Sequence, residues 1–274
     1  MKLRNFLFKI FIAFTLGTFL IIFLSLFVNL FLNGKGFWDP KFLLGSPEGL
    51  PPGREGGIFP AIVGTFITFL LSSVISAFLA IMTAIYVRFY VKSAKVEKIF
   101  TIIIQCISGV PSIVLGLFGY TLLVYKMGLG KSVLSASITL AIMIFPFIEV
   151  RIDKLIQNFD TEKIEIGLSL GLDKGFVIRN IVLKGIKREI IQTITLGGSL
   201  AMGATAPIML TGAVIHAGVP NSLSSSFMSL PYHVYMLINE GISTEMGYKT
   251  AAVLIIILIL INVLSMIFGR KDTK

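Results

Sequence analysis

The 274-residue sequence is poor in charged residues and contains very little cysteine, histidine or tryptophan. Asp, Glu, Lys and Arg make up 14% of it, against roughly 25% in soluble domains. The single cysteine, Cys106, lies within an apolar run, which excludes a disulfide framework and a cysteine-ligated metal cluster. Two histidines leave few imidazole ligands, so we expect no structural zinc and no cofactor.

Apolar residues fill most of the chain: 55% of residues are hydrophobic and the mean hydropathy is +0.91. A transmembrane helix takes about 20 such residues, so the chain holds about six crossings and has no room for a separate catalytic domain. The segments of spanning length are Phe6–Leu32, Ile58–Val87, Ile99–Tyr125, Ser132–Val150, Ile190–Val214 and Ala251–Phe268. We predict an all-α polytopic membrane protein in which residues 1–57 form the first helix and an external loop, and residues 58–274 form a core of five helices.

Positive charge, which gives a formal net charge of +10, is distributed unevenly among the connections. Of the 24 Lys and Arg residues, 18 lie among the first nine residues, after the last segment, or in the second and fourth connections. Because basic residues resist translocation, this predicts a multi-pass protein of the cell membrane with both termini and residues 151–189 in the cytoplasm. The basic residues form no stripe interleaved with aromatics, so we expect membrane lipid and no nucleic acid as a partner.

The fourth connection, residues 151–189, is the only long one on the predicted cytoplasmic side. Asp160 or Thr161 can cap a helix there, and Gly171 can end it. Gly167 and Gly171 lie four residues apart, a spacing that permits close approach by another surface. On these grounds alone the segment also fits a plain solvated helical hairpin.

The spacing in this connection resembles the EAA motif, the cytoplasmic coupling loop of ABC importer permeases. That motif reads Glu-Ala-Ala, three residues, Gly, nine residues, Ile-x-Leu-Pro, and the matching positions here are Glu165, Gly171, Ile181 and Leu183. The departures are Ile166 and Gly167 for the two alanines and Lys184 for the proline. The resemblance implies ATPase-coupling residues at Glu165, Gly167, Leu168 and Gly171.

Longer strings elsewhere resemble the PstA family, the permease subunits of phosphate ABC importers. They are GGIFPAIVGT at 56–65, SGVPSIVLGLFG at 108–119, GATAP at 203–207 and SLPYHVY at 229–235. The resemblance implies the MetI-like fold of type I importers. It also implies four partner subunits of three kinds: a second, PstC-like permease, two PstB-like ATPase subunits and an external phosphate-binding protein. The chain has no Gly-x-x-x-x-Gly-Lys-Ser/Thr loop, so we expect ATP hydrolysis on a separate subunit and a non-catalytic role here.

Two further groups of residues are candidates for the transport path and for a partner. Proline breaks beside small and hydroxyl residues expose polar groups to a pathway, which gives Ser108, Ser112, Gly203, Thr205 and Pro207 as path residues. The loop residues Ser229, Leu230, Pro231 and Tyr232 are candidates for contact with the binding protein. Leu200 and Ala204 stand where the family usually has Arg and Glu, which weakens the case for phosphate as substrate or shifts the cation to the partner permease.

Other functions fit parts of the pattern. A permease for sulfate or molybdate would share the coupling loop but not the strings at residues 56 and 229. A secondary transporter without an ATPase predicts ionisable residues inside the membrane, and the middles of these segments contain almost none. Glu149, near a segment end, is expected to pair with Arg151 or Lys154. Residues 167–171 match Gly-x-Ser-x-Gly, but no strand-to-helix turn surrounds them, which excludes a serine hydrolase.

Overall fold

The computed structural model describes residues 2–269, which are mostly helical. The helices are α1 (Lys2–Asn33), α2 (Pro40–Leu44), α3 (Phe59–Ile85), α4 (Ala94–Ser108), α5 (Ser112–Gly119), α6 (Val133–Gln157), α7 (Thr161–Ser169), α8 (Lys174–Val177), α9 (Leu183–Gly185), α10 (Lys187–Met202), α11 (Ala206–Thr211), α12 (Leu230–Asn239) and α13 (Thr244–Gly269). Three π-helical turns are η1 (Tyr86–Tyr90), η2 (Tyr120–Lys126) and η3 (Ile178–Val182). The strands β1 (Pro47–Glu48) and β2 (Glu55–Gly56) form one antiparallel hairpin.

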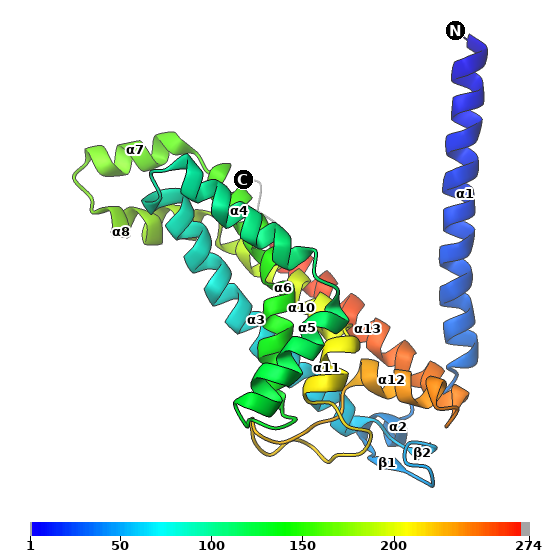
Figure 1. The fold of residues 1–274 in the computed structure, drawn as a ribbon. Helices are drawn as coiled ribbons and strands as arrows, with labels where there is room; N and C mark the ends of the chain where they lie inside the picture. Colours follow the sequence, from blue (N-terminus) through cyan, green and yellow to red (C-terminus); the bar gives the residue numbers. More distant parts are fainter. Residues whose placement is uncertain (1, 270–274) are drawn as a thin grey trace.

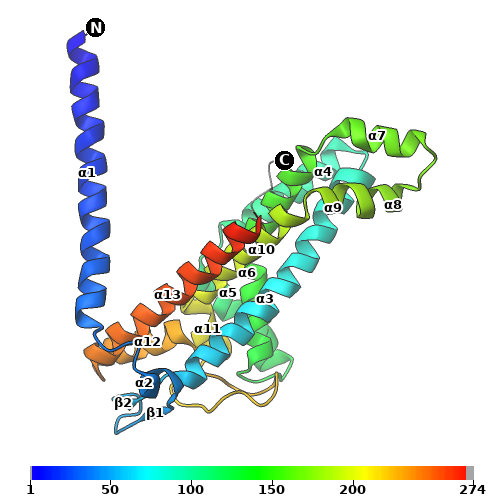
Figure 2. The same ribbon diagram turned by 180° about the vertical axis from the view of Figure 1, so that it is seen from behind.

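The long helices form an elongated bundle with two different ends (Figure 1). One end carries α7 and α8, and the beginning of α1 and the end of α13 point the same way. The other end carries α2, the β1–β2 hairpin and α12, and the view from behind shows the same division (Figure 2). The start of α1, the end of α13 and the fourth connection therefore share one side, as the charge distribution predicts.

Helices α3 and α6 pack side by side at the centre of the bundle, both running towards the end that carries α7, and α10 lies beside both. The buried face of α6 repeats every four residues through Leu140, Ile144, Ile148 and Ile152, each 0–1% exposed. Where α10 meets α3, the packing depends on small residues: a Cβ on Gly198 would lie 2.2 Å from Ser73 Oγ. In a lipid bilayer the hydrophobic effect does not drive helices together, and helices associate through such close packing of small residues.

The all-α class is confirmed, but the six predicted segments are not six continuous helices. Among residues 2–269, four helices are long and apolar enough to span a membrane: α1, α3 with η1, α6 and α13. The third predicted segment is bent by 95° between α4 and α5, and becomes a fifth span if the bent pair is one crossing. The predicted segment Ile190–Val214 is interrupted between α10 and α11, and neither helix, with 16 and 6 residues, is long enough to span a membrane by itself.

Both interruptions occur at predicted proline breaks. Pro111 precedes α5, and Pro207 occupies the first turn of α11. Each proline lacks a backbone donor, and each follows a glycine, Gly109 or Gly203, that favours leaving the helix. Pro146, in contrast, lies inside the uninterrupted helix α6.

Helix α1 stands apart from the bundle (Figure 1 and Figure 2). None of its spanning window is buried, and it touches the bundle near its carboxyl end. There the chain approaches α13 so closely that a Cβ on Gly34 would lie 3.0 Å from the carbonyl oxygen of Tyr248. The apolar surface of α1 is therefore uncovered within a single chain.

Candidate functional site

The first candidate site is the hairpin of α7 and α8. The Asp160 carboxylate accepts a hydrogen bond of 3.1 Å from the Glu162 N–H and so caps α7, which confirms the predicted cap. The Asp173 carboxylate caps α8 in the same way. The hairpin projects from the end of the bundle where α1 begins (Figure 1).

The two glycines of this hairpin have different roles. Gly167 is buried, and a Cβ there would lie 2.9 Å from Ile181 Cδ1 and 3.2 Å from Val177 Cγ2. A Cβ on Gly171 would meet no atom within 4 Å, but the φ of +78° at this position is one that L-residues avoid. Within this chain Gly167 is packed inside the hairpin and Gly171 is open, and the approach of another surface at these positions stays a prediction.

The outward surface of the hairpin combines carboxylates with apolar side chains. Glu165 and Leu168 are exposed, as a contact surface for a partner requires. The neighbouring Ile166 and Leu170 are 53% and 75% exposed, and Phe176 adds a further exposed apolar side chain from α8. Exposed apolar groups gathered at one tip are typical of a protein interface.

A lysine ties this hairpin to the end of α3. Lys174 Nζ donates a hydrogen bond of 2.5 Å to the Phe89 carbonyl in η1. The same ammonium lies 4.8 Å from the centre of the Tyr90 ring, within cation–π distance. Lys174 therefore links the start of α8 to η1.

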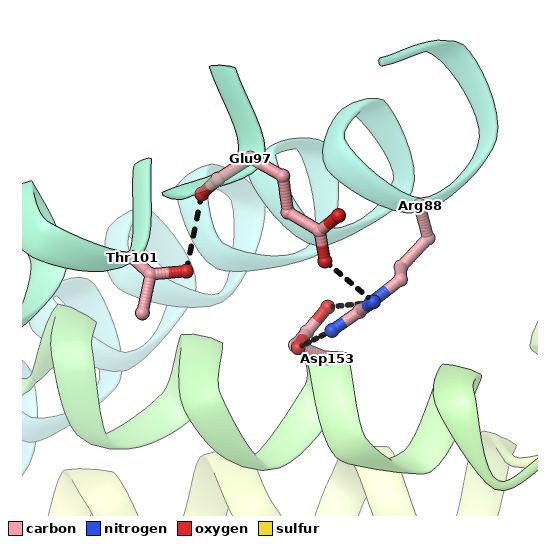
Figure 3. Close-up of polar contacts among 4 residues, drawn as sticks. All are labelled: Arg88, Glu97, Thr101 and Asp153. Atoms are coloured by element: carbon pink, nitrogen blue, oxygen red, sulfur yellow. Dashed lines mark hydrogen bonds and ion pairs between the residues drawn. The ribbon is translucent and has the colours of Figure 1, made fainter. Parts of the chain in front are cut away.

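Arg88 of η1 then joins three helices (Figure 3). Its Nε and Nη2 donate to the two Asp153 oxygens of α6 at 2.5 and 2.6 Å, and its Nη1 donates to Glu97 of α4 at 2.9 Å. Thr101 Oγ1 donates to the Glu97 carbonyl one turn away. Bidentate pairing holds the guanidinium in one orientation, so α3, α4 and α6 are fixed relative to one another at this end.

Sequence reasoning missed this cluster. Glu149 is 4% exposed, and its charged neighbours are Arg88 and Asp153. Its expected pairing with Arg151 or Lys154 is wrong, because the Arg151 guanidinium instead lies 4.5 Å from the centre of the Phe147 ring. Arg88 and Asp153 are 65 residues apart, and no local pattern links them.

The second candidate site lies at the two helix breaks. Ser108 and Ser112 flank the bend between α4 and α5, and both are exposed. In the other break Gly203 is exposed, Thr205 is half-buried and Pro207 is buried. The two breaks belong to neighbouring elements, because α5 packs on α11 so closely that a Cβ on Gly116 would lie 2.8 Å from Pro207 Cα.

The four residues predicted to contact a binding protein are buried. Exposure is 1% for Ser229, 0% for Leu230 and 9% for Tyr232, and Pro231 is also buried. Thr65 Oγ1 accepts a hydrogen bond of 2.8 Å from the Leu230 N–H, which joins the start of α12 to α3. These side chains therefore position α12 and offer nothing to an outside protein, so the predicted contact is wrong for them.

His233 lies beneath the first loop at the same end of the bundle. It is 5% exposed, and a Cβ on Gly53 would lie 3.1 Å from its Cε1. Burial lowers the pKa of His233 to about 4, so the imidazole is neutral at physiological pH. Within residues 2–269, no group of three or more His, Cys, Asp and Glu side chains could hold a metal ion.

Comparison with curated proteins finds permeases. The chain is 28% identical over 212 residues to the phosphate transport system permease protein PstA 2 of Mycobacterium tuberculosis, covering 76% of this chain and 70% of that protein. It is 28% identical over 211 residues to the probable phosphate transport system permease protein PstA of Methanocaldococcus jannaschii, covering 76% and 74%. The PstA protein of Pasteurella multocida is 24% identical over 225 residues, covering 81% and 80%.

Solved structures with the same fold are ABC transporters. A bacterial ABC transporter involved in import of the acidic polysaccharide alginate superposes with a TM-score of 0.72 at 16% identity, covering 99% of this chain and 97% of that one. The inward-facing MetNI methionine ABC transporter gives a TM-score of 0.63 at 16% identity, covering 79% and 98%. Residues 76–271, over two thirds of the chain, match the family described as the binding-protein-dependent transport system inner membrane component. The chain belongs to that family and is a non-catalytic permease subunit of an ABC importer.

Proposed function

We propose that this permease carries inorganic phosphate, passing it from an external binding protein to the cytoplasm. The observation that carries the proposal is the likeness to proteins named phosphate transport permeases over about three quarters of the chain. Its partners are a PstC-like permease, two PstB-like ATPase subunits and a phosphate-binding protein. The end with α7 faces the cytoplasm, because the connections and chain ends on that side hold 18 of the 24 basic residues.

The α7–α8 hairpin is the coupling element in this proposal. Glu165 and Leu168 contact the ATPase, Gly167 keeps the hairpin closed, and Gly171 makes its turn. ATPase closure moves the hairpin, and Lys174 passes the movement to η1. Arg88 then moves α4 and α6, and α4 leads directly into the bend before α5. ATP binding thus favours one of two states through different contacts in each.

The path runs past the two helix breaks. Ser108, Ser112 and Thr205 offer hydroxyls, and the interrupted backbone near Gly203 and Pro207 offers neutral hydrogen bonds. Leu200 is exposed beside them and carries no charge. A desolvated phosphate needs a cation, because burying an unpaired charge is costly. The partner permease therefore supplies the cationic group.

Orientation is tested with single cysteines in a Cys106→Ala background. Ser46 and Ser169 lie at opposite ends of the molecule, and both are exposed. In intact cells, an impermeant thiol reagent should label a cysteine at Ser46 and not one at Ser169. Labelling at Ser169 alone would invert the orientation and remove the coupling assignment.

Function is tested on the assembled complex. The tagged chain should co-purify with an ATPase and a second permease. In liposomes with the binding protein, the complex should take up radioactive phosphate only when ATP is present on the hairpin side. Excess sulfate or molybdate should leave uptake unchanged. Competition by either oxyanion would reassign the substrate, and uptake without any ATPase would make the chain a secondary transporter.

A further inference from the structure

Two hollows adjoin at the end of the bundle opposite α7. The first, of about 750 Å³, lies between the first loop, α2 and the start of α13 and is lined by charged side chains of both signs. The second, of about 350 Å³, lies between α2, α3 and α13 and is lined by apolar side chains alone. Leu44 lines both hollows, so they meet at α2.

One face of α13 connects the two hollows. Glu245 and Lys249 line the charged hollow and form an ion pair of 2.6 Å, whereas Val253 and Ile257 line the apolar one. Residues four apart lie on one side of a helix. At 1.5 Å per residue, about 12 Å of helix separates Lys249 from Ile257. The face therefore passes from charged to apolar as it enters the spanning part of α13.

The charged hollow holds groups that remain available to a ligand. Lys41 and Arg54 supply two cations, and Glu48 and Glu55 supply two carboxylates. Within the described residues, none of these four side chains forms an ion pair. The hollow thus presents both signs of charge directly beside an apolar groove. Trp38, which is 66% exposed, borders that groove, as tryptophans do at the edge of a bilayer.

We propose that the two hollows together bind one phospholipid whose headgroup carries a phosphate and a primary ammonium group, as in phosphatidylethanolamine. Lys41 and Arg54 bind the phosphate, Glu48 and Glu55 bind the ammonium, and an acyl chain lies in the groove along α13. A purely anionic headgroup would leave both carboxylates without a cation and place further negative charge beside them, which is unfavourable. A quaternary ammonium has no N–H to donate to them.

The test uses the full-length chain, purified in mild detergent and stripped of lipid. It is offered phosphatidylethanolamine, phosphatidylcholine and phosphatidylglycerol with identical acyl chains, and native mass spectrometry counts the bound lipid. We expect phosphatidylethanolamine to be retained about tenfold better than the other two. Combining Glu48→Gln with Glu55→Gln should reduce its retention to that of phosphatidylcholine.

The apolar half of the site has a matched control. Ile256→Trp fills the groove and should lower the retention of all three lipids. Leu264→Trp makes the same change at an exposed position about two turns further along α13 and should leave retention unchanged. Equal retention of the three lipids by the wild-type chain, or no effect of the two Gln substitutions, overturns the proposal.

Two other occupants would also overturn it. If soluble phosphoethanolamine binds as tightly as the whole lipid, the charged hollow is a solute site. If a cysteine at Ile256 cross-links to a helix of the second permease in the assembled complex, the groove is a protein interface.

Discussion

Replacing Arg88 by Met should weaken the fold measurably, because one guanidinium satisfies carboxylates from two helices. The substitution removes three charge-assisted hydrogen bonds, leaves Asp153 and Glu97 without their cation, and leaves Asp153 close to the buried Glu149. Breaking a fully buried pair costs about 3–5 kcal/mol, and an exposed pair contributes about 0–1 kcal/mol. The side chains of Arg88 and Asp153 are 24% and 19% exposed, so we expect a loss of about 2–3 kcal/mol.

A double-mutant cycle isolates the pairwise part of this loss. The variants are Arg88→Met, Asp153→Leu and the double variant, with the free energy of unfolding measured in mild detergent. We expect a coupling energy of about 1.5–2 kcal/mol. The matched control is the pair Lys163–Asp160, which is 3.4 Å long with side chains 63% and 46% exposed. For this exposed pair we expect about 0.5 kcal/mol or less.

The same variants test transmission of movement. In the assembled complex, Arg88→Met should lower the phosphate transported per ATP hydrolysed relative to the unsubstituted complex. Arg88→Lys keeps the charge without the bidentate geometry and should fall between the two. A coupling energy for Arg88–Asp153 no larger than that of the control pair would refute the structural argument. An unchanged transport ratio would refute the mechanical one.

Three further predictions concern single residues. Gly167→Leu should open the α7–α8 hairpin, lower the free energy of unfolding by about 1–3 kcal/mol and abolish ATPase binding in pull-downs. Gly171→Ala should lower the free energy of unfolding by about 1–2 kcal/mol, because the φ of +78° disfavours an L-residue, and should weaken ATPase binding less. Burial lowers the pKa of His233 from 6.5 to about 4, so as the pH falls the unfolded chain takes up the proton before the folded chain does. The contribution of His233 to the free energy of unfolding should therefore be at its maximum above pH 6.5 and fall by about 3 kcal/mol as the pH drops to 4. In titrations in detergent, His233→Gln should remove this pH dependence. Thr205→Val should reduce phosphate uptake in liposomes by about two- to twelvefold, since a neutral hydrogen bond contributes about 0.5–1.5 kcal/mol, and complete loss would mean that Thr205 does more than donate one.

The features that sequence reasoning predicted correctly are those that depend on nearby residues. Asp160 caps α7 through the N–H two residues ahead, so the residue type and its position suffice. The break before α5 is similar, because Gly109 and Pro111 act together within a few residues. Pro146, in contrast, stands between two phenylalanines, and α6 continues through it, as the predicted segment Ser132–Val150 requires.

Features that depend on distant residues could not be predicted. Spacing alone marked Gly167 and Gly171 as equivalent, yet one is packed against Ile181 and the other adopts a positive φ. The Arg88 cluster joins residues 9 and 65 positions away. Charge composition indicated only that the connections were basic. Which acidic residues pair with Arg88 depends on where the helices end in space, and the sequence does not show this.

The residues in the strings that resemble the phosphate permeases chiefly make packing contacts between helices. Residues 56–65 meet residues 229–235 where Thr65 accepts from the Leu230 N–H, and a Cβ on Gly64 would lie 2.1 Å from the Met228 carbonyl oxygen just before them. Residues 108–119 meet residues 203–207 where Gly116 faces Pro207. Such contacts specify how the helices cross and are compatible with any substrate. The choice of substrate therefore depends on the exposed positions between them, and at Leu200 and Ala204 this chain has apolar side chains in place of charge. Under the proposed division of roles, in which the partner permease supplies the cation, a variant of that cationic residue tests phosphate selectivity more directly than any substitution in these strings.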